Sequence, residues 1–289
     1  MLNLASRYLL LLFLLGQSWL IHAGAPGDTL CQAPCSTDGK WELSVGLGVG
    51  VSTNPLKDGS DIPLMVRPKL SYYGERIFFD NYEAGLILWE NPTQQINLLI
   101  APSLEQLYFR RWQYASRSLS LNPESIKGDG ASDSPQEAMR HLRHRHTSAL
   151  GGFEYNASLS DVVDGLEFNW QFLEELSGYH AGREMRLAIS RDFLTYWRAS
   201  FGANFQSRDY INYYFGVDAQ EENALFKEYQ AERGGWSKLV RVEYLKPLNQ
   251  HFAIKGSAAL KLFSSEVASS PLLEESSVYS VFVGGVYYF

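Results

Sequence analysis

The stretch 277-SVYSVFVGGVYYF-289 at the end of the chain decides the fold that this sequence predicts. Alternate residues lie on one face of a strand, and here one face carries the side chains of Tyr279, Val281, Val283, Tyr287 and Phe289. The segment contains neither Pro nor charge, although exposed edge strands of soluble proteins usually carry one or the other. We therefore expect this strand to pair with another and close a sheet, in preference to ending an ordinary sheet.

The same alternation recurs along the chain. In 41–52, Trp41, Leu43 and Val45 begin an apolar face that opposes small or polar residues. Most such segments span about ten to thirteen residues, longer than the ~5–6 usual in globular sheets and suited to a tilted strand that crosses a membrane. We predict strands at 41–52, 63–73, 76–90, 94–108, 147–159, 165–176, 182–193, 195–207, 210–216, 236–247, 251–263 and 277–289. This gives about 12 strands, and ten is the alternative because 210–216 is short.

Charged residues interrupt the polar faces in the middle of several predicted strands, as at Arg186, Asp192, Arg198, Arg241, Glu243, Lys255 and Lys261. Charges at such positions need water or a partner, which the lumen of a barrel supplies. The connectors alternate between tight turns, such as Asn91–Thr93 and Asn249–Gln250, and long polar loops, such as 110–146 and 218–234. This asymmetry is typical of outer-membrane barrels. We predict an all-β protein, an antiparallel transmembrane β-barrel over 41–289.

The N-terminal region differs from the rest of the sequence. Residues 1–23 have the order of a cleaved secretory signal peptide, with Arg7 before an uncharged run rich in Leu. A retained transmembrane helix is the alternative, but the run is shorter than the ~20 residues that a helical span needs. Residues 24–40 would then form a periplasmic extension in which Cys31 and Cys35 could form a local disulfide. A metal site at these two cysteines would require further ligands.

The composition excludes some classes of function. The net charge of −7 argues against a nucleic-acid partner, and we identify no cofactor-binding motif. No GxSxG nucleophile elbow is present in the sequence, so we do not expect an enzyme. Aromatic residues make up 14% of the chain, which agrees with the aromatic girdles that such barrels place at both membrane interfaces.

Three polar loop regions are candidate sites. Residues 218–232 suggest a short helix whose Leu225, Phe226 and Tyr229 lie at helical spacing and could constrict the lumen. We expect Glu221-Glu222 in the same loop to be solvated rim charges. The basic cluster 141–146 contains three histidines. It could contact lipopolysaccharide phosphates or, as the weaker alternative, hold a metal ion.

Several short motifs resemble a known family. They are the run Tyr213, Tyr214, Phe215, Gly216 and Val217, then Ser270 and Pro271, and the ending Gly285, Tyr287 and Phe289. Together they resemble the MltA-interacting protein (MipA/OmpV) family of outer-membrane proteins, over about 41–289. The ending is similar to the signal through which the barrel-assembly machinery recognises its clients.

This resemblance implies a barrel in the outer membrane of a Gram-negative bacterium, surrounded by lipid and lipopolysaccharide. It also implies a scaffold that links a lytic transglycosylase and a penicillin-binding protein in peptidoglycan (murein) synthesis. Other members of the family resemble porins or transport proteins, so a small-solute channel is the second hypothesis. An outer-membrane lipid-modifying enzyme is the third.

Overall fold

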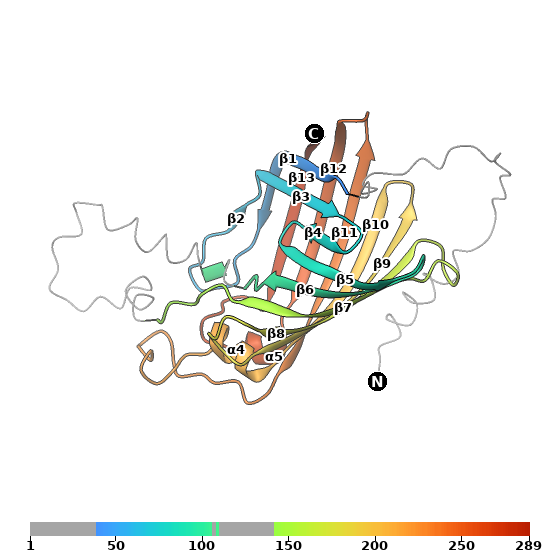
Figure 1. The fold of residues 1–289 in the computed structure, drawn as a ribbon. Coiled ribbons are helices and arrows are strands. Elements are labelled where there is room, and N and C mark those ends of the chain that lie inside the picture. Colours follow the sequence, from blue (N-terminus) through green and yellow to red (C-terminus); the bar gives the residue numbers. More distant parts are fainter. Residues whose placement is uncertain (1–38, 106–107, 110–141) are drawn as a thin grey trace, which may run out of the picture. The chain divides into compact units, whose positions relative to one another are not determined.

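The computed structural model describes residues 39–105, 108–109 and 142–289 and shows a closed antiparallel β-barrel (Figure 1). The predicted signal peptide at 1–23 lies outside the described residues, as do Cys31 and Cys35. Nearly all of the predicted extension at 24–40 lies outside them too. Among the described residues, no helix is both long enough and apolar enough to cross a membrane.

One sheet contains every strand of the described chain. The strands are β1 (Trp41–Ser52), β2 (Ile62–Pro63), β3 (Val66–Tyr73), β4 (Ile77–Asp80), β5 (Glu83–Glu90), β6 (Gln94–Pro102), β7 (Ala149–Ser158), β8 (Leu166–Glu175), β9 (Arg183–Leu194), β10 (Trp197–Gln206), β11 (Gly235–Pro247), β12 (Phe252–Leu262) and β13 (Ser277–Tyr288). From β3 to β13 each strand pairs with the next along the chain, β2 and β3 both pair with β1, and β13 pairs with β1 from Ser44↔Tyr288 to Ser52↔Ser280. This last pairing closes the sheet, as the sequence predicted.

The barrel has twelve strands, because β2 and β3 lie one after the other along the same side of β1. The predicted count is therefore confirmed, but two of the predicted segments are wrong. The segment 76–90 is not one strand but two, β4 and β5, which form an antiparallel pair joined by a tight turn at Asn81. The segment 210–216 is not a strand and lies largely within helix α4 (Arg208–Phe215).

The apolar face of the strands points outward. Along β1 the side chains of Trp41, Leu47 and Val49 are exposed, whereas Gly46, Gly48 and Gly50 alternate with them on the inner side. Along β13 the same holds for Tyr279, Val281 and Val283, while Phe282 is buried in the lumen. Outward apolar and inward polar side chains suit a barrel whose outer surface faces lipid and whose interior is hydrated.

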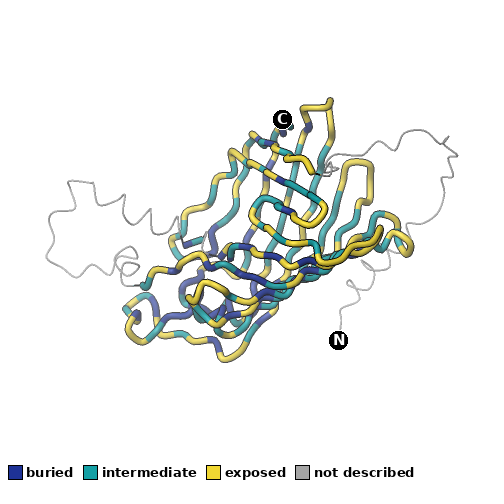
Figure 2. Tube along the Cα trace, viewed as in Figure 1, coloured by how far each residue is buried: buried dark blue, intermediate teal, exposed yellow. Residues whose placement is uncertain are grey.

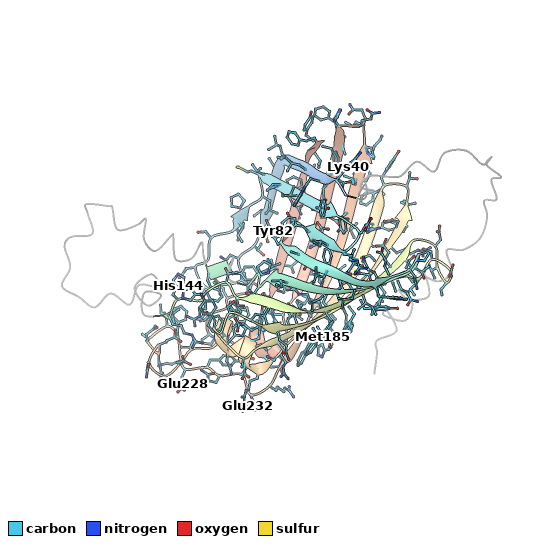
Figure 3. All side chains as sticks on the ribbon, in the orientation of Figure 1. Lys40, Tyr82, His144, Met185, Glu228 and Glu232 are labelled. Atoms are coloured by element: carbon cyan, nitrogen blue, oxygen red, sulfur yellow. The ribbon has the colours of Figure 1, made fainter. Side chains whose placement is uncertain are left out.

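The two ends of the barrel differ. The connectors at one end, here called the turn end, are the short ones 74–76, 91–93, 195–196 and 248–251 and the seven-residue 159–165. At the other end, here called the loop end, lie the connectors 53–61, 176–182, 207–234 and 263–276, together with the described residues 103–105, 108–109 and 142–148. Figure 3 shows Lys40 near the turn end, with Glu228 and Glu232 at the opposite end.

One part of the wall is incompletely paired. β4 pairs with β3 only over Ser71–Tyr73, so Val66 and Pro68 have no strand partner on that side among the described residues. The Gly48 amide of β1 donates a hydrogen bond to the carbonyl oxygen of Met65. Backbone groups alternate in direction along a strand, so every second residue after Met65 also bonds to β1. Pro68 has the opposite parity, so its nitrogen faces the gap. A proline has no N–H to leave unpaired there.

The closing seam brings two backbones into close contact. Gly48 of β1 lies opposite Gly284 of β13. A Cβ atom added at Gly48 would lie 2.2 Å from the carbonyl oxygen of Val283 and 2.9 Å from the ring of Phe282. Only glycine therefore allows the observed approach of the two strands at this point.

We predict that Gly48→Val weakens closure by about 1–3 kcal/mol, because the added side chain must displace backbone and an aromatic ring. The fraction of protein that folds into lipid vesicles, measured by the gel mobility of unheated samples, should fall. The matched control is Val49→Ala, since Val49 is 74% exposed on the outer face. Equal folding of the two variants would contradict this role of the glycine pair.

Candidate functional site

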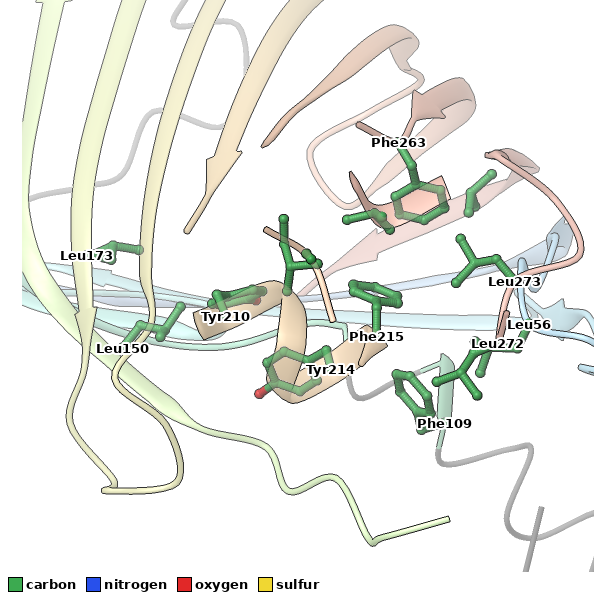
Figure 4. Packing of buried hydrophobic residues seen from close by; sticks show 14 of the residues in the cluster. Leu56, Phe109, Leu150, Leu173, Tyr210, Tyr214, Phe215, Phe263, Leu272 and Leu273 are labelled. Carbon is green, nitrogen blue, oxygen red and sulfur yellow. The ribbon is translucent and has the colours of Figure 1, made fainter. Parts of the chain in front are cut away.

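A hydrophobic cluster fills the loop end of the barrel. Figure 2 shows the buried residues concentrated around α4, and Figure 4 shows aromatic and leucine side chains packed against each other. The cluster draws on the connectors 53–61, 207–234 and 263–276 and on Phe109. Its loop members include Leu56, Phe109, Tyr210, Ile211, Tyr214, Phe215, Val217, Phe226, Ala231, Val267, Leu272 and Leu273. We call this cluster the cap.

Helix α4 forms the centre of the cap. The side chain of Ser207 accepts a hydrogen bond from the Tyr210 amide, which caps the N-terminus of the helix. Tyr210, Ile211, Tyr214 and Phe215 repeat at helical spacing on one face, and all four are buried. A short helix α5 (Ser265–Ala268) lies close to α4 and contributes the buried Val267.

The structure therefore contains a short loop helix, as predicted, but it is α4 at Arg208–Phe215 and does not lie within 218–232. Residues 218–232 contain no helix. A local interaction keeps 218–232 from forming a helix: the side chain of Asn223 accepts from the amides of Leu225 and Phe226 and holds a turn there. The structure places Phe226 inside the cap, while Leu225 and Tyr229 pack against it. The Tyr229 hydroxyl donates to the carbonyl oxygen of Glu266.

Two arginines, the buried Arg145 and the half-buried Arg143, fix the base of this loop. The Arg145 guanidinium lies 3.1 Å from Glu221 and donates at 2.7 Å to the carbonyl oxygen of Gly216. Burial lowers the pKa of Arg145, although the neighbouring Glu221 opposes this shift. Arg143 forms a second ion pair with Asp218 at 2.7 Å. Glu221 is thus a buried partner rather than the solvated charge predicted, whereas Glu222 is exposed.

A second polar group joins the cap to the barrel wall. The Glu105 carboxylate, 4% exposed, accepts from Lys261 of β12 at 3.0 Å and from the Tyr210 hydroxyl of α4 at 2.6 Å. Gln206 at the end of β10 donates to the same carboxylate at 3.0 Å. We call Glu105, Lys261, Tyr210 and Gln206 the latch. Burial favours the neutral acid, but the Lys261 charge and the Tyr210 hydrogen bond outweigh it and lower the pKa of Glu105.

A serine and a histidine also meet beside Tyr214 of the cap. The Ser148 hydroxyl lies 3.2 Å from Nε2 of His180, while Nδ1 of His180 accepts from the Gly182 amide at 3.0 Å. The neutral ring therefore carries its proton on Nε2 and donates to Ser148. A catalytic dyad needs the reverse arrangement, and Ser148 is fully buried. This pair does not form a competent nucleophile.

The basic cluster predicted at 141–146 is only partly within the described residues, because His141 lies outside them. His144 and His146 are exposed at the loop end, and the ring of His146 stacks on Tyr179 with 4.8 Å between centroids. Within the described part of the chain, no group of three His, Cys, Asp or Glu side chains could hold a metal ion.

Below the cap, a network of polar side chains spans the lumen. Arg186 of β9 forms ion pairs with Glu184 at 3.0 Å and with Glu83 of β5 at 3.2 Å. Asn204 of β10 donates to Glu184 at 2.7 Å. These contacts join strands on different sides of the lumen, so the interior beneath the cap is occupied by paired charges.

Between this network and the turn end lies a cavity of about 540 Å³, here called the vestibule. The carboxylate and amide side chains of Asp80, Glu83, Glu90, Asn97, Glu154 and Glu167 contribute to its lining, and it extends to the turn at 91–93. The lumen is therefore hollow toward the turn end and closed toward the loop end.

Comparison with known sequences places this architecture in a family. The family described as MltA-interacting protein MipA matches residues 45–289, which is the whole barrel except its first residues. The chain belongs to this family. This match confirms the resemblance to the family that was inferred from the sequence.

Several members are similar to this chain at low identity. The MltA-interacting protein of Escherichia coli strain K12 is 23% identical over 248 residues, which cover 86% of this chain and 90% of that protein. The putative outer membrane protein YiaT of the same strain is 21% identical, with 85% and 89% covered. OmpV of Vibrio cholerae is 28% identical over 141 residues, with 48% and 53% covered. These names locate the family in the outer membrane.

Among solved structures, the chain is similar to a KdgM porin. The TM-score is 0.39 and the identity 9%, with 85% of this chain and 99% of that chain covered. The channel CymD is similar at a TM-score of 0.32 and 10% identity, with 87% and 88% covered.

The two internal segments that suggested the family in the sequence meet in the cap. Phe215 and Val217 of the first motif are buried in the cluster, with Tyr214. The hydroxyl of Ser270, in the second motif, donates to the carbonyl oxygen of Phe215 at 2.6 Å. Pro271 follows Ser270 in the connector between β12 and β13. The barrel-assembly role of Tyr279, Val281, Val283, Tyr287 and Phe289 stays a prediction.

We predict that the latch resists mild acid. A depressed carboxyl pKa contributes stability above its ordinary range near pH 4–5, and this stability is lost only as the pH falls through the depressed value. Hydrogen exchange of the α4 amides, corrected for intrinsic rate, should therefore stay slow from pH 7 to pH 5.

Lys261→Met should make the α4 amides exchange faster, because it leaves the Glu105 carboxylate buried without its cationic partner. Protection of α4 at pH 7 should fall by about 3 kcal/mol or more. Lys227→Met is the control, since Lys227 pairs with Glu222 on the exposed surface and such a pair contributes at most about 1 kcal/mol. Equal protection in both variants would contradict the latch.

Proposed function

We propose that this protein is a closed outer-membrane barrel that acts as a scaffold for murein enzymes and conducts no solutes in its resting state. The observation that carries the proposal is the cap. Phe215, Phe226 and Tyr214 are buried in a continuous cluster at the loop end, and buried aromatic side chains form dense, strongly stabilised packing. A solute could cross only if this packing opened.

The orientation follows from the connectors. Long loops of such barrels face outside the cell and short turns face the periplasm, so the cap would lie at the external surface in contact with lipopolysaccharide. The turn end, with the predicted extension at 24–40, would face the murein layer. A protein closed to the outside but accessible from the periplasm suits a scaffold better than a general pore.

The partners follow from the family. One relative is named MltA-interacting protein, and we extend that interaction to this chain as a lytic transglycosylase bound at the turn end. A penicillin-binding protein would be the second partner. We do not propose an enzyme, because the relatives are named as outer-membrane or interacting proteins and Ser148 and His180 have the wrong proton arrangement.

We predict that crosslinking of intact envelopes, followed by purification of this protein, captures a lytic transglycosylase. Deletion of residues 24–38 should reduce capture at least several-fold, because it alters the periplasmic side. Deletion of 218–232 at the loop end should leave capture unchanged. Failure to capture either enzyme class from crosslinked envelopes would refute the scaffold.

The vestibule favours a second candidate function, a gated channel for small solutes. Its volume of about 540 Å³ lies within the range of small-molecule binding sites. Residues 218–232 supply the buried Phe226 and the Glu221 that pairs with Arg145. They are therefore the segment whose movement would open the cap.

We predict that the intact protein is silent in planar bilayers and that deletion of 218–232 produces steady conductance. The double variant Phe215→Ala and Phe226→Ala should give brief openings, because each truncation removes about 3–5 kcal/mol of packing. Steady conductance by the unmodified protein would make the channel the primary function. A silent deletion variant that folds would exclude the channel.

A further inference from the structure

The vestibule carries a charge that the protein itself does not neutralise. Three of its carboxylates have a cationic partner: Asp80 with Lys69 at 3.7 Å, Glu83 with Arg186 at 3.2 Å and Glu167 with Arg198 at 3.1 Å. Glu90 and Glu154 have no Lys or Arg partner among the described residues. No Lys or Arg belongs to the lining of the cavity. The cavity is therefore net negative.

The inner end of the vestibule contains hydrogen-bond acceptors without enough donors. Glu154 is 7% exposed, and its carboxylate accepts only from amides, at 2.8 Å from Asn97, 2.7 Å from Asn169 and 2.9 Å from Gln171. The side chain of Asn97, 2% exposed, has an oxygen, Oδ1, with no hydrogen-bond partner. A buried acceptor left unpaired costs about 1–3 kcal/mol, so this end of the cavity is suited to a ligand that donates hydrogen bonds.

We propose that the vestibule binds linear organic polyamines from the turn end. An ammonium group has three donors and no acceptor, which complements the carboxylate of Glu154 and the oxygen of Asn97. The phenol of Tyr73 and the ring of Phe78 also belong to the lining, and aromatic rings attract ammonium groups. This binding is independent of the scaffold role.

The spacing of the carboxylates selects an extended ligand over a metal ion. From Glu154 to the level of Ser158, four residues along β7, the vestibule runs about 13 Å at ~3.3 Å per residue. Glu167 lies opposite Ser158 at the outer end of this path. A triamine such as spermidine, which has seven methylene groups and one amine between its terminal ammoniums, spans a similar length when extended. In the described part of the chain no three carboxylates converge on one point, so a divalent cation has no coordination site there.

The test uses the full mature protein in nanodiscs, with spermidine titrated by calorimetry at pH 7.5 and constant ionic strength. We expect saturable binding at one site. Glu154→Gln should weaken it at least tenfold, because the amide removes the charge and presents donors of its own. Glu222→Gln, which makes the same change on the exposed surface of the loop end, should bind like the unmodified protein.

Four outcomes would overturn the proposal. They are absence of spermidine binding, equal binding by Glu154→Gln, equal weakening by Glu222→Gln, and displacement of spermidine by Mg²⁺ at matched charge concentration, which indicates screening alone. If Glu154→Gln does not fold, Glu90→Gln at the outer end should weaken binding severalfold instead, and equal affinity in that variant would also overturn it.

Discussion

Everything in this molecule depends on the pairing of β13 with β1. In a bilayer, each unpaired backbone amide or carbonyl costs several kcal/mol, so a sheet is stable there only when it closes on itself. The last strand has no blunting Pro or charge because it is not an edge. It lies against Ser44–Ser52 over its length, and the two glycines at the seam allow the approach. Only a closed wall provides a lumen to be capped at one end and hollow at the other.

The cap and the vestibule show how the lumen is divided. At the loop end, the cluster around α4 removes water, and the latch places a carboxylate, an ammonium and a phenol inside that dry environment. Toward the turn end, carboxylates and amides remain in contact with a cavity. One set of strands supplies both regions, because inward-facing residues change from apolar, as at Leu150 and Leu173, to polar, as at Glu154 and Asn169, along the same strands.

The sequence predicted the fold because alternation is a local property of each strand. It predicted the cap poorly for two different reasons. The run from Tyr210 to Phe215 is rich in residues that favour strands, yet Ser207 as N-cap and the helical spacing of its apolar residues were signals of α4 that sequence reasoning missed. The latch left no such signal. Glu105 and Lys261 are 156 residues apart, and nothing in either segment identifies the other.

The incomplete wall beside β3 has a consequence for the surrounding membrane. Val66 and Pro68 present backbone to a place where the neighbouring strand has already turned back. Hydrocarbon chains cannot solvate those carbonyl oxygens, so water or lipid headgroups must reach them. Lipid along this side of the protein must therefore admit water or headgroups to the backbone, a demand that the fully paired strands elsewhere do not make.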